Sequence, residues 1–529
     1  MDIPEISDTR NNNPSKLNWF DKIKAIKGNI NQKAMLKSLV VFLGFLIVLG
    51  VVQFSTPDLP GNDGFYHIKM AYLVRTEGIK PDFPWLPLTI LNAREFYNHH
   101  FLFHVLLVPF TFGDLVLGAK LAVVIFSATA FWMVWFLLDK QEVPYSAVWA
   151  LGLLAVSEAF ILRMSIPRAQ TLSLGILALA LHWLLMRRHK RLIVLGFIFV
   201  WLYNAFPLLL VAAGAYTLSV WLVEKRLDLR PLIYSSLGIT AGLLINPYLP
   251  YNLAFIFQHI LPKIIDTTGV SVGSEWYPYD TQQLLNNSPL ALGMFISAVL
   301  ALGLSNRRMR VNTATGFILA TIFGLMLFQS RRFIEYFPAF VLIFAAFAWT
   351  PIIAEFKSKA VSNADMPSAL MRHKWVKHLP LVILLVFLLP MGWKTLRDSQ
   401  ESVQSSKPYQ LFEGASDWLI KNTPAGERVF QTDWDDFPRL FFYNTHNTYL
   451  VGLDPTYMQI YDPDLYSVWV DITRGRIENP STIIEKNFGA SYILSDLQHE
   501  RFIRQADNDP QLQEVYRDAD AVIFQVVDG

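Results

Sequence analysis

Long apolar runs separated by short polar segments occupy most of the chain up to about residue 395. A helix needs about 20 apolar residues to cross a bilayer, and roughly 17–25 are tolerated. The pattern therefore predicts eleven membrane-spanning helices. Their expected ranges are 38–56, 116–138, 145–162, 170–186, 192–206, 207–223, 231–247, 288–304, 312–329, 334–352 and 379–395. The fifth and sixth runs adjoin at residues 204–207, which indicates either a kinked pair or a miscount.

Basic residues between the runs predict the orientation, because loops that stay in the cytoplasm carry an excess of Lys and Arg. Five basic clusters fall on the N-terminal side of the membrane if eleven spans are counted, and they begin at Lys22, Arg187, Lys225, Arg307 and Lys357. The expected parts are a cytoplasmic segment at 1–37, a membrane domain at 38–395 and an extracytoplasmic domain at 396–529. The N-terminus is polar and rich in Lys, so no cleaved signal peptide is expected.

The composition changes to that of a soluble domain after Trp393. Helix-like and strand-like segments alternate there, with helices expected at 409–421 and 481–488 and strands at 428–431, 448–451, 491–494 and 521–527. Such alternation is typical of a small α/β domain. The expected fold class is therefore a mainly α polytopic membrane protein with a C-terminal extracytoplasmic α/β domain.

Composition narrows the class of function. The chain has 529 residues, of which 53% are hydrophobic and 17% are charged, and its formal net charge is only +2. No overall positive field therefore favours a nucleic-acid partner. The chain has no cysteine, which excludes disulfides, thiolate metal sites and cysteine nucleophiles. No Gly-rich phosphate loop of the Rossmann type is visible, which fits a lipid-linked donor better than a nucleotide sugar.

The first external segment carries candidate chemistry at Asp63, His67 and His100. Asp63 lies where a helix is expected to begin, so it is either an N-cap or a carboxylate that activates an acceptor or binds a metal. His100 and His104 are four residues apart and would share a helix face, as zinc ligands do. The simpler interpretation is a short helix along the membrane interface, at 101–112, whose imidazoles meet water or headgroups.

Two adjacent arginines, Arg331 and Arg332, lie on the predicted outer side, against the charge bias. Guanidinium groups suit bidentate contacts with phosphate. The alternative is snorkelling at the interface, with Glu335 paired to Arg331 one helical turn back. Arg163 and Arg168 form a second outer pair of the same kind.

Two further segments combine acidic residues with loop composition. Glu275 lies in the Gly/Ser-rich loop 269–278, where it either faces a ligand or is an ordinary solvated residue. Trp434 and Asp435 belong to the acidic segment 432–437 of the C-terminal domain. Three acids around a Trp either hold a sugar or peptide or tie two strands together.

Taken in order, these motifs resemble those of the oligosaccharyltransferase catalytic subunit family, and more broadly the GT-C class of membrane glycosyltransferases. The family's Asp-x-Tyr-type motif is matched at 63–66, and its Ser-Val-x-Glu-like loop motif is approximated at 271–275 with one extra residue. Its late Arg-Phe motif, with Tyr and Pro downstream, is matched at 332–338. Its Trp-Trp-Asp motif is approximated at 433–435. The order and topological side of all four agree.

Two departures from the family pattern matter. The family usually places an acidic pair in the second external loop, where this chain has Arg168-Ala169-Gln170. A divalent cation, Mg or Mn, with Asp63 and Glu275 as its ligands, is therefore left open. The first Trp of the Trp-Trp-Asp motif is lost, so recognition of an Asn-x-Ser/Thr acceptor has no support. These departures indicate a divergent bacterial relative.

The resemblance implies an inverting glycosyltransferase that moves a sugar or glycan from a polyprenyl phosphate or diphosphate to an extracytoplasmic protein or glycan acceptor. It implies direct displacement at the anomeric carbon. Asp63 would be the general base or orient the acceptor, and Glu275 would close the loop over the acceptor or complete an acidic site. Arg332, helped by Arg331, would stabilise the departing lipid phosphate. Trp434 and Asp435 would shape the acceptor side, and His67 and His100 would belong to the acceptor side or its loop.

Three alternatives share the membrane architecture. A cell-surface polysaccharide polymerase or ligase differs only in its acceptor, whereas a transporter or flippase of lipid-linked glycan is not an enzyme. A scaffold that binds cell-wall partners is the third. Transporters tend to place charges at the bilayer midplane, but the charges singled out here lie at the predicted outer ends of the spans. The expected setting is a multi-pass inner-membrane protein whose partners are the bilayer, the lipid-linked donor and the acceptor.

Overall fold

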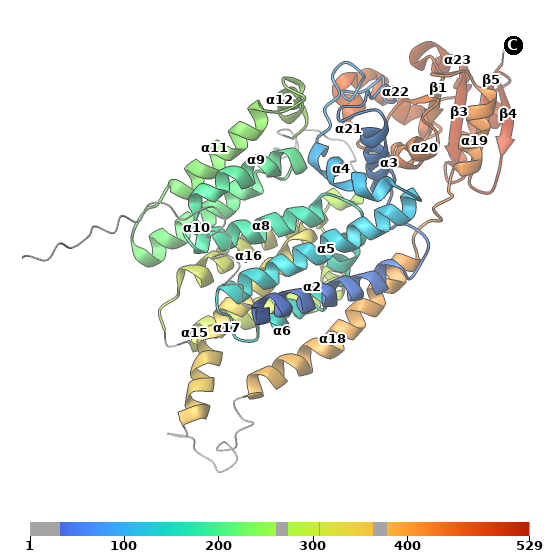
Figure 1. The fold of residues 1–529 in the computed structure, drawn as a ribbon. Helices are drawn as coiled ribbons and strands as arrows, with labels where there is room; N and C mark the ends of the chain where they lie inside the picture. Colours follow the sequence, from blue (N-terminus) through green and yellow to red (C-terminus); the bar gives the residue numbers. More distant parts are fainter. Residues whose placement is uncertain (1–31, 261–272, 306, 363–377, 528–529) are drawn as a thin grey trace, which may run out of the picture.

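The computed structural model describes residues 32–260, 273–305, 307–362 and 378–527. A bundle of long helices forms one part of the molecule, and a small α/β domain lies at one end of it (Figure 1). The last helix of the bundle leads directly into the α/β domain. We refer to the bundle end next to this domain as the cap end and to the opposite end as the far end.

A helix occurs at each apolar run of the sequence. The bounds are α2 (Gln32–Gln53), α5 (Leu115–Lys140), α8 (Gln170–Leu185), α9 (Leu192–Leu202), α10 (Leu208–Glu224), α11 (Arg230–Leu244), α15 (Pro289–Leu304), α16 (Val311–Gln329), α17 (Phe337–Ser362) and α18 (Leu379–Gln404). The fifth and sixth runs are two separate helices, α9 and α10. In the described ranges, five helices are long and apolar enough to cross a membrane, or seven if each of two bent pairs is one span. The chain is thus a multi-pass membrane protein, and the count of eleven stays a prediction.

The run expected to span at 145–162 is broken in the structure. It consists of α6 (Ser146–Leu151) with a 3-10 turn and then α7 (Glu158–Ser165), and the two halves are bent by 81°. Backbone groups freed inside an apolar bundle need polar partners. Thr395 donates a hydrogen bond to the Ala155 carbonyl at the break, and the Ser157 side chain caps α7 by accepting from the Phe160 amide. The break directs α7, and the arginines near its end, across the cap end.

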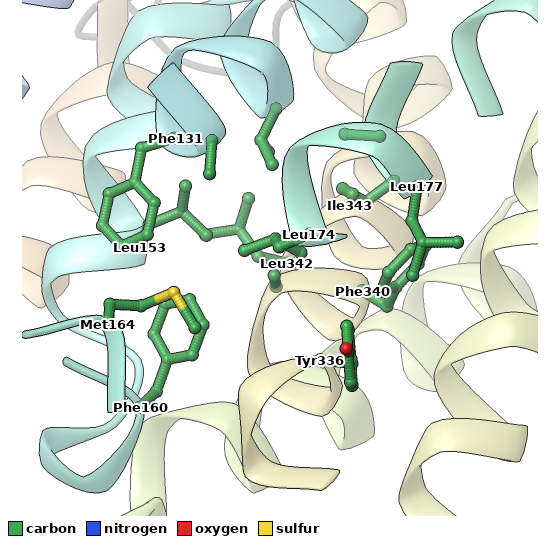
Figure 2. Close-up of a cluster of buried hydrophobic side chains, with 14 of the residues drawn as sticks. Phe131, Leu153, Phe160, Met164, Leu174, Leu177, Tyr336, Phe340, Leu342 and Ile343 are labelled. Atoms are coloured by element: carbon green, nitrogen blue, oxygen red, sulfur yellow. The ribbon is translucent and has the colours of Figure 1, made fainter. Parts of the chain in front are cut away.

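Tightly packed apolar side chains hold the broken helix in place (Figure 2). Phe160 of α7 stacks on Phe131 of α5, with ring centroids 5.5 Å apart, and Met164 and Leu174 are fully buried beside them. Close packing of this kind fixes backbone positions, since interiors tolerate few voids. Tyr336, just before α17, hydrogen-bonds Ser173 of α8 at 2.8 Å. The start of α17 is therefore joined to the same rigid core.

Several short helices connect the long helices of the bundle. They are α3 (Asp63–Thr76), α4 (Phe101–Leu107), η1 (Val108–Thr111), α12 (Tyr251–Phe255), η4 (Ile256–Ile260), η5 (Ser274–Trp276), α14 (Thr281–Asn287) and η6 (Arg331–Glu335). In the segment expected along the interface at 101–112, Phe101 and Phe103 are buried against the protein, whereas Phe112 is exposed. Aromatic rings of α3 meet the C-terminal domain, with Phe65 and Phe442 centroids 5.3 Å apart. The α/β domain is therefore packed onto the bundle.

The C-terminal domain contains a five-stranded sheet in the order β2-β1-β3-β5-β4. The strands are β1 (Arg428–Gln431), β2 (Thr448–Tyr449), β3 (Tyr492–Asp496), β4 (Leu512–Arg517) and β5 (Ala521–Val526). The pairs β1–β2 and β1–β3 are parallel, and the other two are antiparallel. Around it lie α19 (Glu413–Asn422), η9 (Trp434–Asp436), α20 (Phe437–Tyr443), α21 (Thr456–Tyr461), α22 (Pro463–Thr473), α23 (Ser481–Ile483), η10 (Ile484–Phe488) and α24 (Glu500–Asn508).

The α/β prediction is confirmed for this domain, with one strand missed. β4 is an edge strand whose Gln513, Glu514 and Arg517 are exposed, so it lacks the apolar pattern that marks the other strands. The carboxyl end of β1 matters most for function. Because parallel strands end at the same edge, the segment after β1 lies beside the end of β3, and Thr432 hydrogen-bonds Ser495 at 2.9 Å. The acidic segment 432–437 is fixed at this edge.

Ion pairs gather basic loops at the far end. Lys37 near the start of α2 lies 2.5 Å from Asp139 near the end of α5, and Arg187 after α8 pairs with Glu224 at the end of α10. Three of the five basic clusters that the sequence assigns to one side of the membrane therefore lie beside these two ion pairs. Since cytoplasmic loops are the basic ones, we expect the far end to face the cytoplasm.

Cysteine labelling tests this orientation cleanly, because the chain has no cysteine of its own. Asp417→Cys on α19 and Lys190→Cys in the loop after α8 both replace exposed residues. In sealed spheroplasts, a membrane-impermeant maleimide should label Asp417→Cys, and should label Lys190→Cys only after permeabilisation. The reverse pattern would invert the orientation, and labelling of both from one side would contradict the odd number of crossings expected between them.

Candidate functional site

Three arginine side chains converge on the carboxylate of Glu275 at the cap end. Arg163 Nη2 and Arg168 Nη1 lie 2.8 Å and 3.2 Å from Glu275 Oε2. Arg332 Nη1 lies 3.5 Å from Glu275 Oε1. The four side chains come from α7, the α7–α8 turn, η5 and η6, and they are between 15% and 26% exposed. We call Arg163, Arg168 and Arg332 the arginine cluster.

Arg168 also reaches Asp63, whose Oδ2 lies 2.5 Å from the arginine Nε. A close approach of two backbones makes this contact possible, because Gly64 has no Cβ. A Cβ on Gly64 would lie only 3.0 Å from the ring of Pro167, the residue before Arg168. The N-cap interpretation of Asp63 is wrong: Asn62 holds the cap position, and Asp63 is the first helical residue with its side chain on Arg168.

Glu335 is a third acid in the same network. Its Oε1 lies 3.8 Å from Arg163 Nε, and the side chain is almost fully buried. The expected pairing of Glu335 with Arg331 is therefore corrected, because η6 is a 3-10 helix that turns Glu335 inward towards α7. Burial raises the pKa of Glu335, against the opposing effect of Arg163. Burial also opposes ionisation of Glu275, but the arginine cluster outweighs it and holds the pKa of Glu275 well below its usual value.

Arg332 has two further partners. Its Nη2 donates a hydrogen bond to the Tyr203 hydroxyl at 3.0 Å, and its guanidinium lies 4.8 Å from the ring centroid of Trp276. Tyr203 follows α9 directly and stacks on His100, with centroids 5.5 Å apart. Sequence analysis missed Tyr203, although the helix break at 204–207 marks the place where a side chain leaves the bundle.

Arg331 occupies a different position from its neighbour. Its Nε donates to the Pro278 carbonyl at 3.1 Å, and its guanidinium lies 5.1 Å from the ring centroid of Tyr279. The amide of Arg331 also donates to the Tyr277 carbonyl. Arg331 thus fixes the segment after Glu275 and, unlike Arg332, has no ion pair with Glu275 among the described contacts. Residues 271 and 272 of the loop motif lie outside the described residues.

The histidines form a buried group beside α3. His67 Nδ1 lies 2.8 Å from His104 Nε2, and His100 packs 4.8 Å from the His67 ring. His104 is fully buried and His67 nearly so, whereas His100 is half-buried. The interpretation that the imidazoles of His100 and His104 meet water or headgroups is therefore wrong for His104. Among the described residues, no group of three or more His, Asp or Glu side chains is arranged to hold a metal ion.

The two acids named as ligands of a divalent cation, should one be present, do not fit that role. Arg168 bridges Asp63 and Glu275, so a positive guanidinium already holds the position between them. Glu275 is in addition shared with Arg163 and Arg332. A divalent cation there would lie among three positive charges at short range, which is strongly unfavourable in a partly buried site. No step proposed below uses a metal.

The C-terminal domain contributes Trp434 and Asp435 to the same region. Asn62 Nδ2 donates to Asp435 Oδ2 at 2.7 Å and to its carbonyl oxygen at 3.1 Å, while Asn62 Oδ1 accepts from Arg439 Nε at 2.8 Å. Trp434 covers the loop, since a Cβ on Gly273 would lie 3.7 Å from its ring. The acidic segment therefore contacts both the start of α3 and the loop that carries Glu275.

The geometry therefore combines a positive cluster with carboxylates at the junction of two domains. The structure brings Asp63, Glu275, Arg332, Arg163 and Arg168 together. Converging guanidiniums bind phosphate through charge-assisted hydrogen bonds. Carboxylates beside such a cluster can orient a hydroxyl or amide nucleophile or take its proton. The arrangement is suited to transfer of a group from a phosphate to a protic acceptor.

Sequence comparison gives no relative: no protein family matches the chain, and no curated protein sequence matches it. Solved structures do match. The archaeal oligosaccharyltransferase AglB from Archaeoglobus fulgidus, in complex with an inhibitory peptide and a dolichol-phosphate, is similar over 93% of this chain and 72% of its own, with a TM-score of 0.63 and 12% identity.

Two bacterial transferases are also similar in structure. ArnT from Cupriavidus metallidurans, bound to undecaprenyl phosphate, matches 92% of this chain and 98% of its own, with a TM-score of 0.54 and 15% identity. The mycobacterial arabinofuranosyltransferase AftD matches 92% of this chain and 40% of its own, with a TM-score of 0.52 and 14% identity. The chain therefore shares its fold with these three proteins, at 12–15% sequence identity.

Proposed function

We propose that this protein is a glycosyltransferase that moves a sugar or glycan from a polyprenyl phosphate or diphosphate to an acceptor outside the cytoplasm. The observation that carries the proposal is the convergence of three guanidiniums on one carboxylate at the cap end. The AglB and ArnT structures that share the fold contain a dolichol-phosphate and an undecaprenyl phosphate. A lipid phosphate entering from the bilayer would take the place of the Glu275 carboxylate on the arginine cluster.

The arginine cluster would act on the leaving group. When the bond from the anomeric carbon to the phosphate oxygen breaks, negative charge grows on the phosphate. Guanidiniums already aimed at an anion stabilise that charge without reorganising. Arg332 is the best placed of the three, since Tyr203 and Trp276 hold its side chain from two sides.

Asp63 would orient the acceptor. Its carboxylate is fixed by Arg168 and lies at the start of α3, next to the residue that binds the C-terminal domain. A fixed carboxylate can accept a hydrogen bond from a hydroxyl or amide and hold it in line with the anomeric carbon. The acceptor would enter beneath Trp434, between the loop at Gly273 and the C-terminal domain.

The transporter alternative is weaker on the same geometry. Transporters place their binding groups near the bilayer midplane at broken helices. Here the arginine cluster and its acids lie at the cap end, against a C-terminal domain that covers them. Protein and glycan acceptors are distinguished by where a radiolabelled donor sugar appears. Transfer in detergent, where no sealed vesicle exists, excludes a purely transporting role.

Replacing Arg332 with alanine should weaken binding of the lipid phosphate. A hydrogen bond to a charged group contributes about 1.5–3 kcal/mol, so affinity for polyprenyl phosphate should fall roughly 10- to 100-fold. Binding to the purified protein in detergent measures this. Arg397→Ala, an exposed arginine on α18, is the matched control and should leave affinity unchanged. Equal affinity of the wild type and the Arg332→Ala variant would remove the phosphate role.

The isosteric Asp63→Asn variant should retain donor affinity and lose transfer. Misplacing a nucleophile lowers the rate by about 100-fold or more, so kcat should fall at least that far. The measurement is transfer of radiolabelled sugar by purified protein, with thermal unfolding recorded beside it because Arg168 loses an ion-pair partner. A folded Asp63→Asn variant with full transfer would contradict the role of Asp63.

A further inference from the structure

Displacement at the anomeric carbon leaves a proton on the attacking acceptor, and this proton needs a base. The two carboxylates nearest the arginine cluster are occupied, since Asp63 is paired with Arg168 and Glu275 is shared by three guanidiniums. Glu335 is buried beneath Arg163. An acid that is close to Asp63 but is not held by a guanidinium would be better suited to accept the proton.

Asp435 meets this description. Its Oδ2 accepts a 2.7 Å hydrogen bond from Asn62, the residue immediately before Asp63. In the described part of the chain, its carboxylate has no ion pair with Lys or Arg within 4.0 Å. The amide of Asp435 donates to Asp433 Oδ1 at 3.0 Å, and this turn fixes its backbone at the end of β1. The carboxyl group is thus held on a rigid edge, facing the start of α3.

Charged groups from four elements surround Asp435. They are Asp63 of α3, Asp433 and Asp436 around η9, Arg168 of the α7–α8 turn and Arg439 of α20. Burial is the largest influence and, with Asp63 and Asp433, raises the pKa of Asp435 to about 7, while the hydrogen bond from Asn62 and the charge of Arg168 act in the opposite direction. A base with a pKa near the working pH is efficient, because a large fraction of it is ionised while it is still basic enough to accept a proton.

We propose that Asp435 is the catalytic base that removes the acceptor proton, a role that rests on the proposed function. The acceptor oxygen or nitrogen forms a bond to the anomeric carbon as the bond from that carbon to the phosphate oxygen breaks. The acceptor proton passes to Asp435 Oδ2. The bonding electrons leave with the polyprenyl phosphate, whose charge the arginine cluster holds. Asp63 positions the acceptor between the two.

The pH dependence follows from this assignment. Asp435 must be ionised to accept a proton, so kcat/KM should rise with pH through about 7 and level off above it. If Asp435 served only in packing, kcat/KM would not rise with pH in this way. We call this rise the limb near pH 7, and it can be assigned to Asp435 only if substitutions of Asp435 and of its neighbours abolish or shift it.

The test uses the full-length purified protein and three variants. Asp435→Asn preserves the hydrogen bond to Asn62 and should lower kcat/KM by about 100- to 10,000-fold and abolish the limb near pH 7. Asp433→Asn removes a neighbouring negative charge and should move the limb to lower pH while transfer continues. Asp417→Asn, on the exposed face of α19, is the control and should change neither.

Affinity for polyprenyl phosphate, measured in the same preparations, separates chemistry from folding. It should stay within about twofold of wild type in Asp435→Asn, because the arginine cluster is untouched. If Asp435→Asn also loses donor binding, the Asp435→Glu variant decides between the two explanations. Sugar transfer whose kcat/KM rises with pH supports the role of base, and transfer that does not depend on pH overturns it. If Asp435→Asn transfers sugar at the wild-type rate with an unchanged pH dependence, the role of Asp435 as the base is overturned and the proposed function is not. A wild type that binds donor and transfers no sugar overturns the proposed function and the base with it.

Discussion

The structure of the cap end depends on the need of three partly buried guanidiniums for an anion. An attraction between unit charges about 4 Å apart is worth about 4 kcal/mol at an effective dielectric of about 20. Removing such charges from water costs a similar amount or more, so the cluster is favourable only when anions are present. Asp63, Glu275 and Glu335 supply them here. A site that always requires an anion can exchange an internal carboxylate for a phosphate.

The surrounding architecture serves to place these charges. The 81° break directs α7 across the cap end, and the packed core around Phe160 prevents it from straightening (Figure 2). Gly64 allows the turn that carries Arg168 to touch the start of α3. The C-terminal domain then closes the region through Asn62 and Asp435. In the proposed mechanism, the bundle would bind the donor phosphate and the C-terminal domain would supply the group that accepts the proton.

Much of this could be predicted from residue patterns. Apolar runs located the helices because burial in lipid demands them, and the charge bias singled out Arg332. Individual ion-pair partners could not be predicted. Glu335 was expected to pair with Arg331, but the 3-10 helix places its side chain next to Arg163. Tyr203 was not predicted, because the sequence does not distinguish an aromatic residue that only packs at a helix end from one that hydrogen-bonds a site arginine. The sequence singled out Asp435 as part of the acidic segment, but it could not predict that the Asp435 side chain is hydrogen-bonded by Asn62 beside Asp63.

An experimental structure with a polyprenyl phosphate bound would test the central claim most directly. We expect the phosphate oxygens within hydrogen-bond distance of Arg332 and of Arg163 or Arg168, with Glu275 displaced from the cluster. A phosphate bound elsewhere on the protein, with Glu275 still held by all three arginines, would contradict it.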